Sequence, residues 1–150
     1  TLSLMGGNIS ISKNEGGLIM NNMKYSFATF GNNVAIINTT PHSVTIQDTD
    51  GTPITVPNSV ILNAKAEERQ VSDLFVKTVF VPTEEGKAII SEIKKAFKSQ
   101  IGTGTLVIVG FMIAAQAYPE DVVAMTPVPG YERVKPAEKR MRCDKFTTFA

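Results

Sequence analysis

The alternation of apolar and polar residues predicts short strands along most of the chain. Continuous apolar runs at residues 34–37 and 74–81 are typical of buried strands. Between them, apolar positions on either side of Asp50-Gly51 predict a hairpin, because this dipeptide favours a tight turn. The run at 74–81 carries β-branched and aromatic residues on both alternating faces. We therefore expect this strand to be covered on both sides, with a second layer above the sheet.

Two helices are predicted among these strands. Thr83 is a good N-cap, two glutamates follow it in the first turn, and apolar residues then recur near helical spacing. We therefore expect the main helix at about 84–99. An alanine-rich stretch at about 111–118 predicts a short helix that a proline ends. Further strands are predicted at 105–109 and 121–125.

Together these elements predict an α+β fold, in which a β-rich single domain with a mostly antiparallel sheet follows an extended β-rich N-terminal arm. The arm, at 1–35, has three short apolar alternations separated by Gly-Gly or Asn-Asn. Strands with so few large side chains bury little surface against each other, so we expect the arm to gain its order against a neighbouring molecule. The body spans 36–150 and ends in a basic C-terminal tail at 126–150.

Composition restricts the class of protein without identifying a function. The chain has 150 residues, of which 43% are hydrophobic, and this is enough for one folded domain. Fifteen basic against 14 acidic residues create no overall attraction to nucleic acid or to an anionic membrane. The longest apolar run is too short for a membrane span, and the first residues lack a signal-peptide pattern. We expect a soluble protein that is not secreted.

No pattern of side chains points to catalysis, a metal ion or a cofactor. His42 is the only histidine, and we expect its ring to fix the turn after Pro41. Asp48 and Asp50 resemble the start of a calcium loop, but the glutamate expected at the twelfth position of such a loop is absent. The single cysteine, Cys143, lies among cations that would favour its thiolate form, but it has no convincing histidine partner. We therefore expect no enzyme activity.

The C-terminal tail has the strongest local charge, with six basic and three acidic side chains. Such cations can clamp phosphates while a tyrosine stacks on a base, which predicts contacts to an anion, a nucleotide or nucleic acid. The same charges also suit a solvated or intersubunit face with ion pairs. The residues that would make the phosphate and base contacts are Tyr131, Arg133, Lys139, Arg140 and Arg142.

Two segments resemble a family of small phage and prophage accessory proteins. The stretch INTTPHSVTIQDTDG at 37–51 is similar to the Asn-x-Thr-Pro-His strand and hairpin with which that family begins. The stretch at 104–125 is similar to the family's strand, short Ala-Gln helix and Asp-Val strand. The resemblance implies a viral setting and gives no residue a role. The arm, the main helix and the basic tail are departures from the family pattern.

Two non-enzymatic functions follow as hypotheses. In the first, the chain is a phage structural or assembly protein, such as a capsid or tail accessory or decoration component. It would bind other phage structural proteins, copies of itself, or both, through its arm. In the second, it is a counter-defence sponge that sequesters a nucleotide signal in a basic pocket. Both hypotheses predict a homo-oligomer in the virion or the host cytoplasm, with no cofactor, metal or membrane.

Overall fold

The structure is a computed structural model that describes residues 24–150 together with the backbone of residues 11–14 and 17–20. These residues form eleven strands, two α-helices and one 3-10 helix. The strands are β1 (Ile11–Asn14), β2 (Gly17–Met20), β3 (Phe27–Thr29), β4 (Val34–Asn38), β5 (Val44–Gln47), β6 (Pro53–Val56), β7 (Ala64–Gln70), β8 (Val76–Pro82), β9 (Thr105–Val109), β10 (Val122–Pro127) and β11 (Met141–Thr147). The helices are α1 (Glu84–Gln100), α2 (Met112–Ala117) and the 3-10 helix η1 (Pro136–Glu138).

Nine strands form one mixed sheet that is nearly closed. Their order is β1-β2-β3-β4-β9-β10-β11-β5-β6. The β4–β9, β9–β10 and β5–β11 pairs are parallel and the other pairs are antiparallel. The β3 side approaches the β5–β6 end, because the Ser26 amide donates to Ser59 Oγ at 2.9 Å and the Gly31 amide to Asp48 Oδ1 at 2.8 Å. The sheet therefore curves around one of its own faces.

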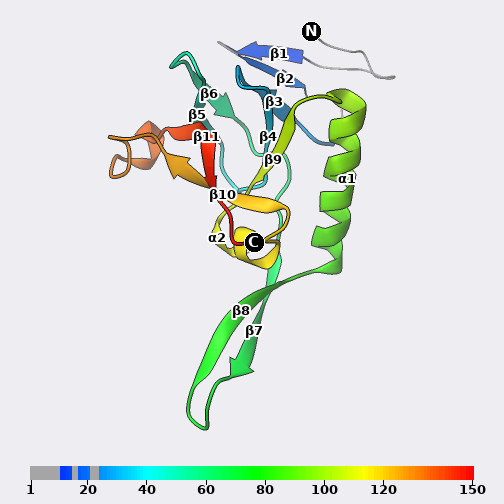
Figure 1. The fold of residues 1–150 in the computed structure, drawn as a ribbon, viewed down its shortest axis with the longest axis vertical. Coiled ribbons are helices and arrows are strands. Elements are labelled where there is room, and N and C mark those ends of the chain that lie inside the picture. The colour runs from blue at the N-terminus through cyan, green and yellow to red at the C-terminus, as the bar shows by residue number, and fades with distance from the viewer. Residues whose placement is uncertain (1–10, 15–16, 21–23) are drawn as a thin grey trace.

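Each face of this sheet has an apolar core. Successive residues of a strand point to opposite faces, so Ile37 joins the core that includes α1 and α2. Its neighbour Ile36 joins the other core, which is built from strands β3, β4, β5, β6, β9 and β11. Figure 1 shows α1 along one side of the sheet and the short α2 near its lower end. The α+β class is confirmed, with more parallel pairing than hairpins alone would give.

Several local predictions are confirmed. The Thr83 hydroxyl caps α1 by accepting a hydrogen bond from the Gly86 amide at 2.9 Å, and two glutamates occupy the first turn. The hairpin predicted at Asp50-Gly51 joins β5 to β6, and Gly51 has the positive φ that this turn requires.

Within the described ranges, neither α-helix combines the length and the apolar composition of a membrane span.

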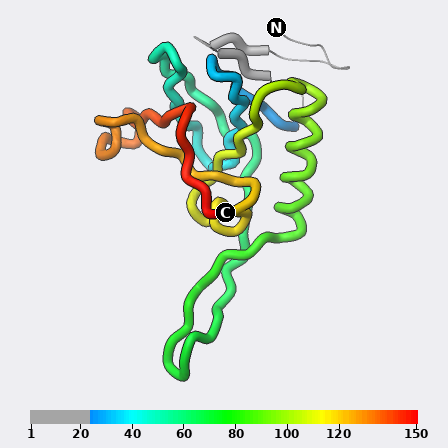
Figure 2. Tube along the Cα trace, viewed as in Figure 1, coloured from blue at the N-terminus to red at the C-terminus, as the bar shows by residue number. Residues whose placement is uncertain are grey.

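The expectation of a second layer over residues 74–81 is wrong. Strand β8 pairs with β7 in a separate two-stranded sheet, and this hairpin projects away from the body (Figures 1 and 2). Most side chains of β8 are exposed at the far end and become half-buried only near the body. The apolar pattern predicted a strand correctly, but the pattern alone contains no information about what covers it.

The C-terminal segment contributes to the sheet instead of forming only a tail. Strand β11 lies between β10 and β5, antiparallel to the first and parallel to the second. Its residue Cys143 is 3% exposed and belongs to the core inside the curved sheet. Alternation along the strand places the charged neighbours of Cys143 on the outer face. A basic sequence can therefore still contain a strand of the sheet.

The last part of the expected arm lies in the body. Phe27 is fully buried and Phe30 nearly so, and they occupy different cores. The apolar side chains of residues 25–30 therefore pack in the cores of their own chain. The backbone of β1 and β2 extends the sheet beyond β3. The rest of the arm, residues 1–10, 15–16 and 21–23, lies outside the described residues.

Candidate functional site

The far end of the β7–β8 hairpin exposes the most prominent apolar group of the described chain. Leu74 is 86% and Phe75 67% exposed, and Val71 and Val76 beside them are also exposed. We call these four residues the apolar tip. Single exposed apolar residues are ordinary, whereas a contiguous group at the end of a projection is typical of an interaction site. Burying each such side chain is worth roughly 1.5–3 kcal/mol, so a partner would gain much from covering them.

Backbone hydrogen bonds give the tip a defined shape. The Val71 amide donates to the Phe75 carbonyl at 2.8 Å, and the Phe75 amide donates back to the Ser72 carbonyl at 3.3 Å. The Gln70 side chain also donates to the Ser72 carbonyl. Below the turn, β7 and β8 pair in register from Gln70–Val76 to Ala64–Pro82. At about 3.4 Å per residue, this ladder holds the tip roughly 20 Å from the base of the hairpin.

The base of the hairpin is fixed by one tyrosine. The Tyr118 hydroxyl donates to the Asn63 carbonyl at 2.8 Å and accepts from the Thr83 amide at 3.1 Å. Asn63 directly precedes β7 and Thr83 directly follows β8. The Tyr118 hydroxyl, at the end of α2, therefore holds both strands against the body. Gly86 makes room for it, since a Cβ at that position would overlap the Tyr118 oxygen. The projection is therefore anchored on the body at both strands.

The Asn-Thr-Thr-Pro-His motif supports the segment that leads into the hairpin. The buried Asn38 side chain donates to the His42 carbonyl at 2.8 Å and to the Val56 carbonyl at 3.1 Å. Thr39 accepts a backbone hydrogen bond from Leu62, at the approach to β7. The His42 side chain is exposed, and this residue holds the turn through its carbonyl instead of through the ring that we expected. The motif is therefore a turn whose asparagine and two threonines are buried and whose proline and histidine are exposed.

The hairpin carries no net charge. Glu67 lies between Lys65 at 3.9 Å and Arg69 at 3.8 Å, and Arg69 stands directly opposite Lys77 in the ladder. Lys77 makes no ion pair with any described residue. Three basic residues balance three acidic ones between residues 64 and 82. This balance favours a protein partner over the anionic surfaces of membranes or nucleic acids.

The predicted phosphate-binding residues divide among three places. Tyr131, Lys139 and Arg140 line one hollow of about 340 Å³, together with Thr45 and Glu138 among others. The Arg140 guanidinium lies 5.2 Å from the centre of the Tyr131 ring, and its Nη1 donates to Gln47 Oε1 at 3.3 Å. Two of the five residues lie outside this lining, namely Arg133, which is exposed, and Arg142.

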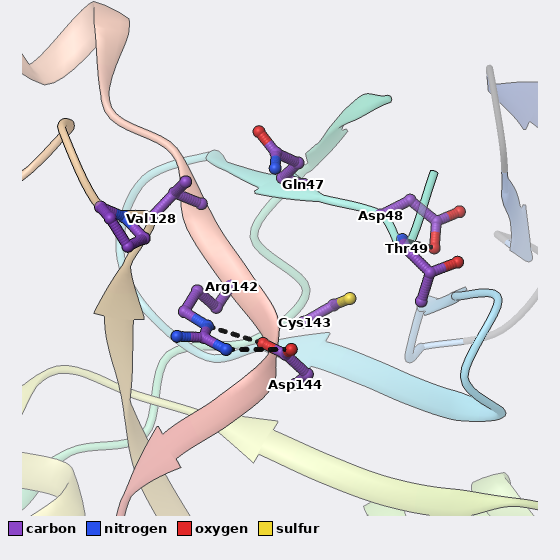
Figure 3. Close-up of a pocket in the computed structure, with 8 residues that line it drawn as sticks. Gln47, Asp48, Thr49, Val128, Arg142, Cys143 and Asp144 are labelled. Atoms are coloured by element: carbon purple, nitrogen blue, oxygen red, sulfur yellow. Dashed lines mark hydrogen bonds and ion pairs between the residues drawn. The ribbon is translucent and has the colours of Figure 1, made fainter. Parts of the chain in front are cut away.

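Arg142 lines a neighbouring hollow of about 330 Å³, where its charge is already paired (Figure 3). Its Nε and Nη2 donate to the two carboxylate oxygens of Asp144 at 2.7 and 3.0 Å. The Arg142 hydrogen bond holds the pKa of the Asp144 carboxyl below its usual range, and the same bond raises the pKa of Arg142. Asp48, also in the lining, is buried and accepts from the amides of Gly31 and Thr49. This hollow therefore lacks a free cation for phosphate.

The Cys143 thiol does not have the cationic environment that we expected from the sequence. Figure 3 shows its sulfur on the opposite side of the strand from Arg142. Burial raises the pKa of Cys143, and the negative charges of Asp144 and Asp48 raise it further. The expectation of a thiolate favoured by nearby cations is wrong, because the cations lie on the outer face of β11 and the thiol lies in the core.

Comparisons with known proteins identify no relative: no protein-family model, no curated protein and no solved structure matches the chain. Within the described ranges, no group of three or more His, Cys, Asp or Glu side chains is arranged to hold a metal ion. The apolar tip is the candidate site that sequence reasoning missed. The sequence contains no signal for its exposure, because an apolar run has the same pattern whether its faces are covered or exposed.

Proposed function

We propose that the chain is a non-enzymatic assembly protein of a phage particle that docks on protein subunits through the apolar tip. The observation that carries the proposal is the exposure of Leu74, Phe75 and their two valine neighbours at the end of an anchored hairpin. The viral setting is supported by the resemblance of residues 37–51 and 104–125 to phage accessory proteins.

The shape and chemistry of the tip favour a concave protein surface as its partner. Phe75 and Leu74 are anchor side chains of the kind that fill pockets at the centre of protein interfaces. The hairpin is already folded and tied to the body by Tyr118, so docking would order little additional chain. The balanced charges of the strands then act at the rim of the interface, where they select the partner and its orientation.

The proposed docking element differs from the N-terminal arm suggested by the sequence pattern. Phe27 and Phe30, which belong to the predicted arm, are buried in the cores of their own chain. The tip, by contrast, has large apolar side chains and no covering segment among the described residues. Docking through residues 1–23 stays a separate hypothesis.

The proposal is tested on a phage whose genome encodes this chain. We expect the double variant Leu74→Asp, Phe75→Asp to be lost from purified particles, with at least about a tenfold fall measured by quantitative mass spectrometry, because it removes both anchors. Ser72→Asp adds a charge to the same turn without removing an apolar side chain, so it should be incorporated normally. Both variants should keep the wild-type circular dichroism. Normal incorporation of the double variant, or absence of the wild-type chain from particles, would contradict the proposal.

One observation supports a second candidate function, the capture of a nucleotide. Arg140 is held in place by Tyr131 and Gln47 and has no carboxylate partner among the described residues, so its guanidinium is available to a phosphate. Calorimetric titration with linear and cyclic nucleotides tests this function. Binding should disappear in Arg140→Ala and persist in Arg133→Ala, which changes a cation outside the hollow. No heat of binding in the wild type would exclude these nucleotides as ligands.

A further inference from the structure

We propose that the apolar tip docks on a second copy of this chain, at a root patch beside the base of the partner's hairpin. The inference rests on the proposed function, because it names the subunit that the tip binds. The root patch consists of two exposed residues, Ile61 and Met112, and their half-buried neighbours Val60 and Phe111. It is thus an apolar surface that partly faces solvent and continues into the core beneath it.

The two halves of the root patch are held close together. Val60 and Ile61 precede β7, whereas Phe111 and Met112 begin α2. Thr39 connects these segments, because its carbonyl accepts from the Leu62 amide at 3.4 Å and its hydroxyl donates to the Val109 carbonyl at 2.7 Å. The backbones of Leu62 and Val109 therefore lie within about 10 Å of each other, the width of two strand spacings, and each is within three residues of its half of the patch.

The tip and the root patch account for nearly all exposed large apolar residues of the described chain. Seven such residues occur, of which four form the tip, two belong to the root patch and the last is Phe149. The β7–β8 hairpin projects from the body (Figure 1), and the root-patch residues stand just before β7 and at the start of α2, at the other end of this hairpin from the tip. When two hairpins lie side by side in opposite directions, each tip reaches the root of the other. Such a two-fold arrangement buries both pairs of surfaces at once.

Charges at the two ends of the hairpin support the same arrangement. Near the tip, Arg69 and Lys77 stand directly opposite each other, and like charges in that position are unfavourable. Near the root, Glu84 and Glu85 occupy the exposed first turn of α1, immediately after β8. Glu85, like Lys77, makes no ion pair with a described residue, whereas Glu84 lies 3.7 Å from Lys87 and Arg69 lies 3.8 Å from Glu67. Antiparallel hairpins would bring the basic pair of one copy toward the acidic pair of the other.

A mixing experiment tests the docking of tip on root. Purified wild-type chain should form dimers or larger assemblies at micromolar concentration, as measured by light scattering after size-exclusion chromatography. Leu74→Asp, at the tip, and Met112→Asp, at the root, should each yield monomers. Mixing the two variants should restore a dimer, because the intact tip of one chain meets the intact root patch of the other. The matched controls Ser72→Asp and Gln116→Asp place the same charge at exposed positions beside each surface and should assemble as wild type.

A charge exchange tests the orientation of the two copies. Lys77→Glu should weaken assembly about three- to tenfold, and the pair Glu84→Lys, Glu85→Lys should do the same. All three changes in one chain should return the dissociation constant toward the wild-type value. A triple variant weaker than either parent would overturn the antiparallel orientation.

Some outcomes would overturn self-docking while leaving the proposed function intact. A wild-type chain that stays monomeric at every concentration, or a mixture of tip and root variants that stays monomeric, excludes a second copy as the partner. The particle-incorporation experiment is independent of this result. Loss of the Leu74, Phe75 double variant from particles would then show that the tip docks on a different phage subunit.

Discussion

The side-chain nitrogen of Asn38 lies 2.8 Å from the carbonyl oxygen of His42 and donates a hydrogen bond to it. The oxygen of the same side chain accepts from the amide and the hydroxyl of Thr40, at 2.9 and 2.6 Å. Asn38 is fully buried, so these bonds replace the water that its amide has lost. The Asn-Thr-Thr-Pro-His motif therefore folds a turn through its asparagine, and its histidine contributes only backbone.

Asn38→Ala should lower the free energy of unfolding by at least about 2 kcal/mol, because it leaves several buried polar groups without partners. His42→Ala should change it by less than about 0.5 kcal/mol, since the exposed ring is removed and the carbonyl stays. Urea denaturation followed by circular dichroism measures both. A larger effect of the histidine change than of the asparagine change would reverse the roles that we assign.

The packing of Gly86 against Tyr118 predicts a coupled pair of mutations. Gly86→Ala should destabilise the chain by about 1–3 kcal/mol, because the added methyl overlaps the tyrosine hydroxyl. Tyr118→Phe should also destabilise it, through loss of the bonds to Asn63 and Thr83. The double variant should be more stable than the sum of the two effects, since the oxygen that overlaps most is gone and only the ring carbon beneath it, 2.6 Å from the added Cβ, must shift. Ser91→Ala, on the exposed face of the same helix, is the control, and strict additivity would contradict this packing.

The contact of Tyr25 with Glu92 predicts a pH dependence at both ends of the scale. Tyr25 Oη donates to Glu92 Oε1 at 2.6 Å. Burial, and then the glutamate, raises the pKa of Tyr25 above its ordinary value of 10.0. The same hydrogen bond, and then Lys24, lowers the pKa of Glu92 below its ordinary 4.5. The Tyr25 contribution to stability is thus full below pH 10 and lost at higher pH, whereas that of Glu92 is full above pH 4.5 and lost at lower pH.

Tyr25→Phe should therefore flatten the pH dependence of unfolding in both directions. The measurement is the free energy of unfolding near neutral pH, below pH 4.5 and above pH 10, compared with wild type. Tyr131→Phe removes a hydroxyl away from this contact and serves as the control. An unchanged profile in Tyr25→Phe would show that the contact does not contribute to stability.

Cys143 should react slowly with a thiol-specific reagent while the chain is folded. Its thiol is buried in the core, and burial raises its pKa, so both exposure and thiolate fraction are low. Labelling by dithionitrobenzoate should accelerate by at least about a hundredfold in denaturing urea, because access then no longer requires opening of the sheet. As the chain has one cysteine, one equivalent is the endpoint. Fast labelling of the native chain would place the thiol at the surface.

Local order was largely readable from the sequence. Thr83 caps a helix because its hydroxyl meets an amide three residues away, and Asp50-Gly51 turns a hairpin because glycine tolerates a positive φ. The apolar residues of α1 likewise recur at the spacing of one helical turn, which the helix itself determines. These signals depend on residues close together in the chain, so no knowledge of the fold is needed to detect them.

Only the tertiary structure decided what each strand lies against. The insertion of β11 beside β5 joins residues about a hundred positions apart, and nothing in the local pattern of either strand specifies the other. The same holds for the run at 74–81, whose pattern is identical whether its faces are covered within the chain or by a partner. Arg140 and Arg142 are two residues apart, yet they line different hollows, and only the folded chain shows this. Sequence determines the elements through short-range sterics and hydrogen bonds, whereas burial and exposure are properties of the assembled whole.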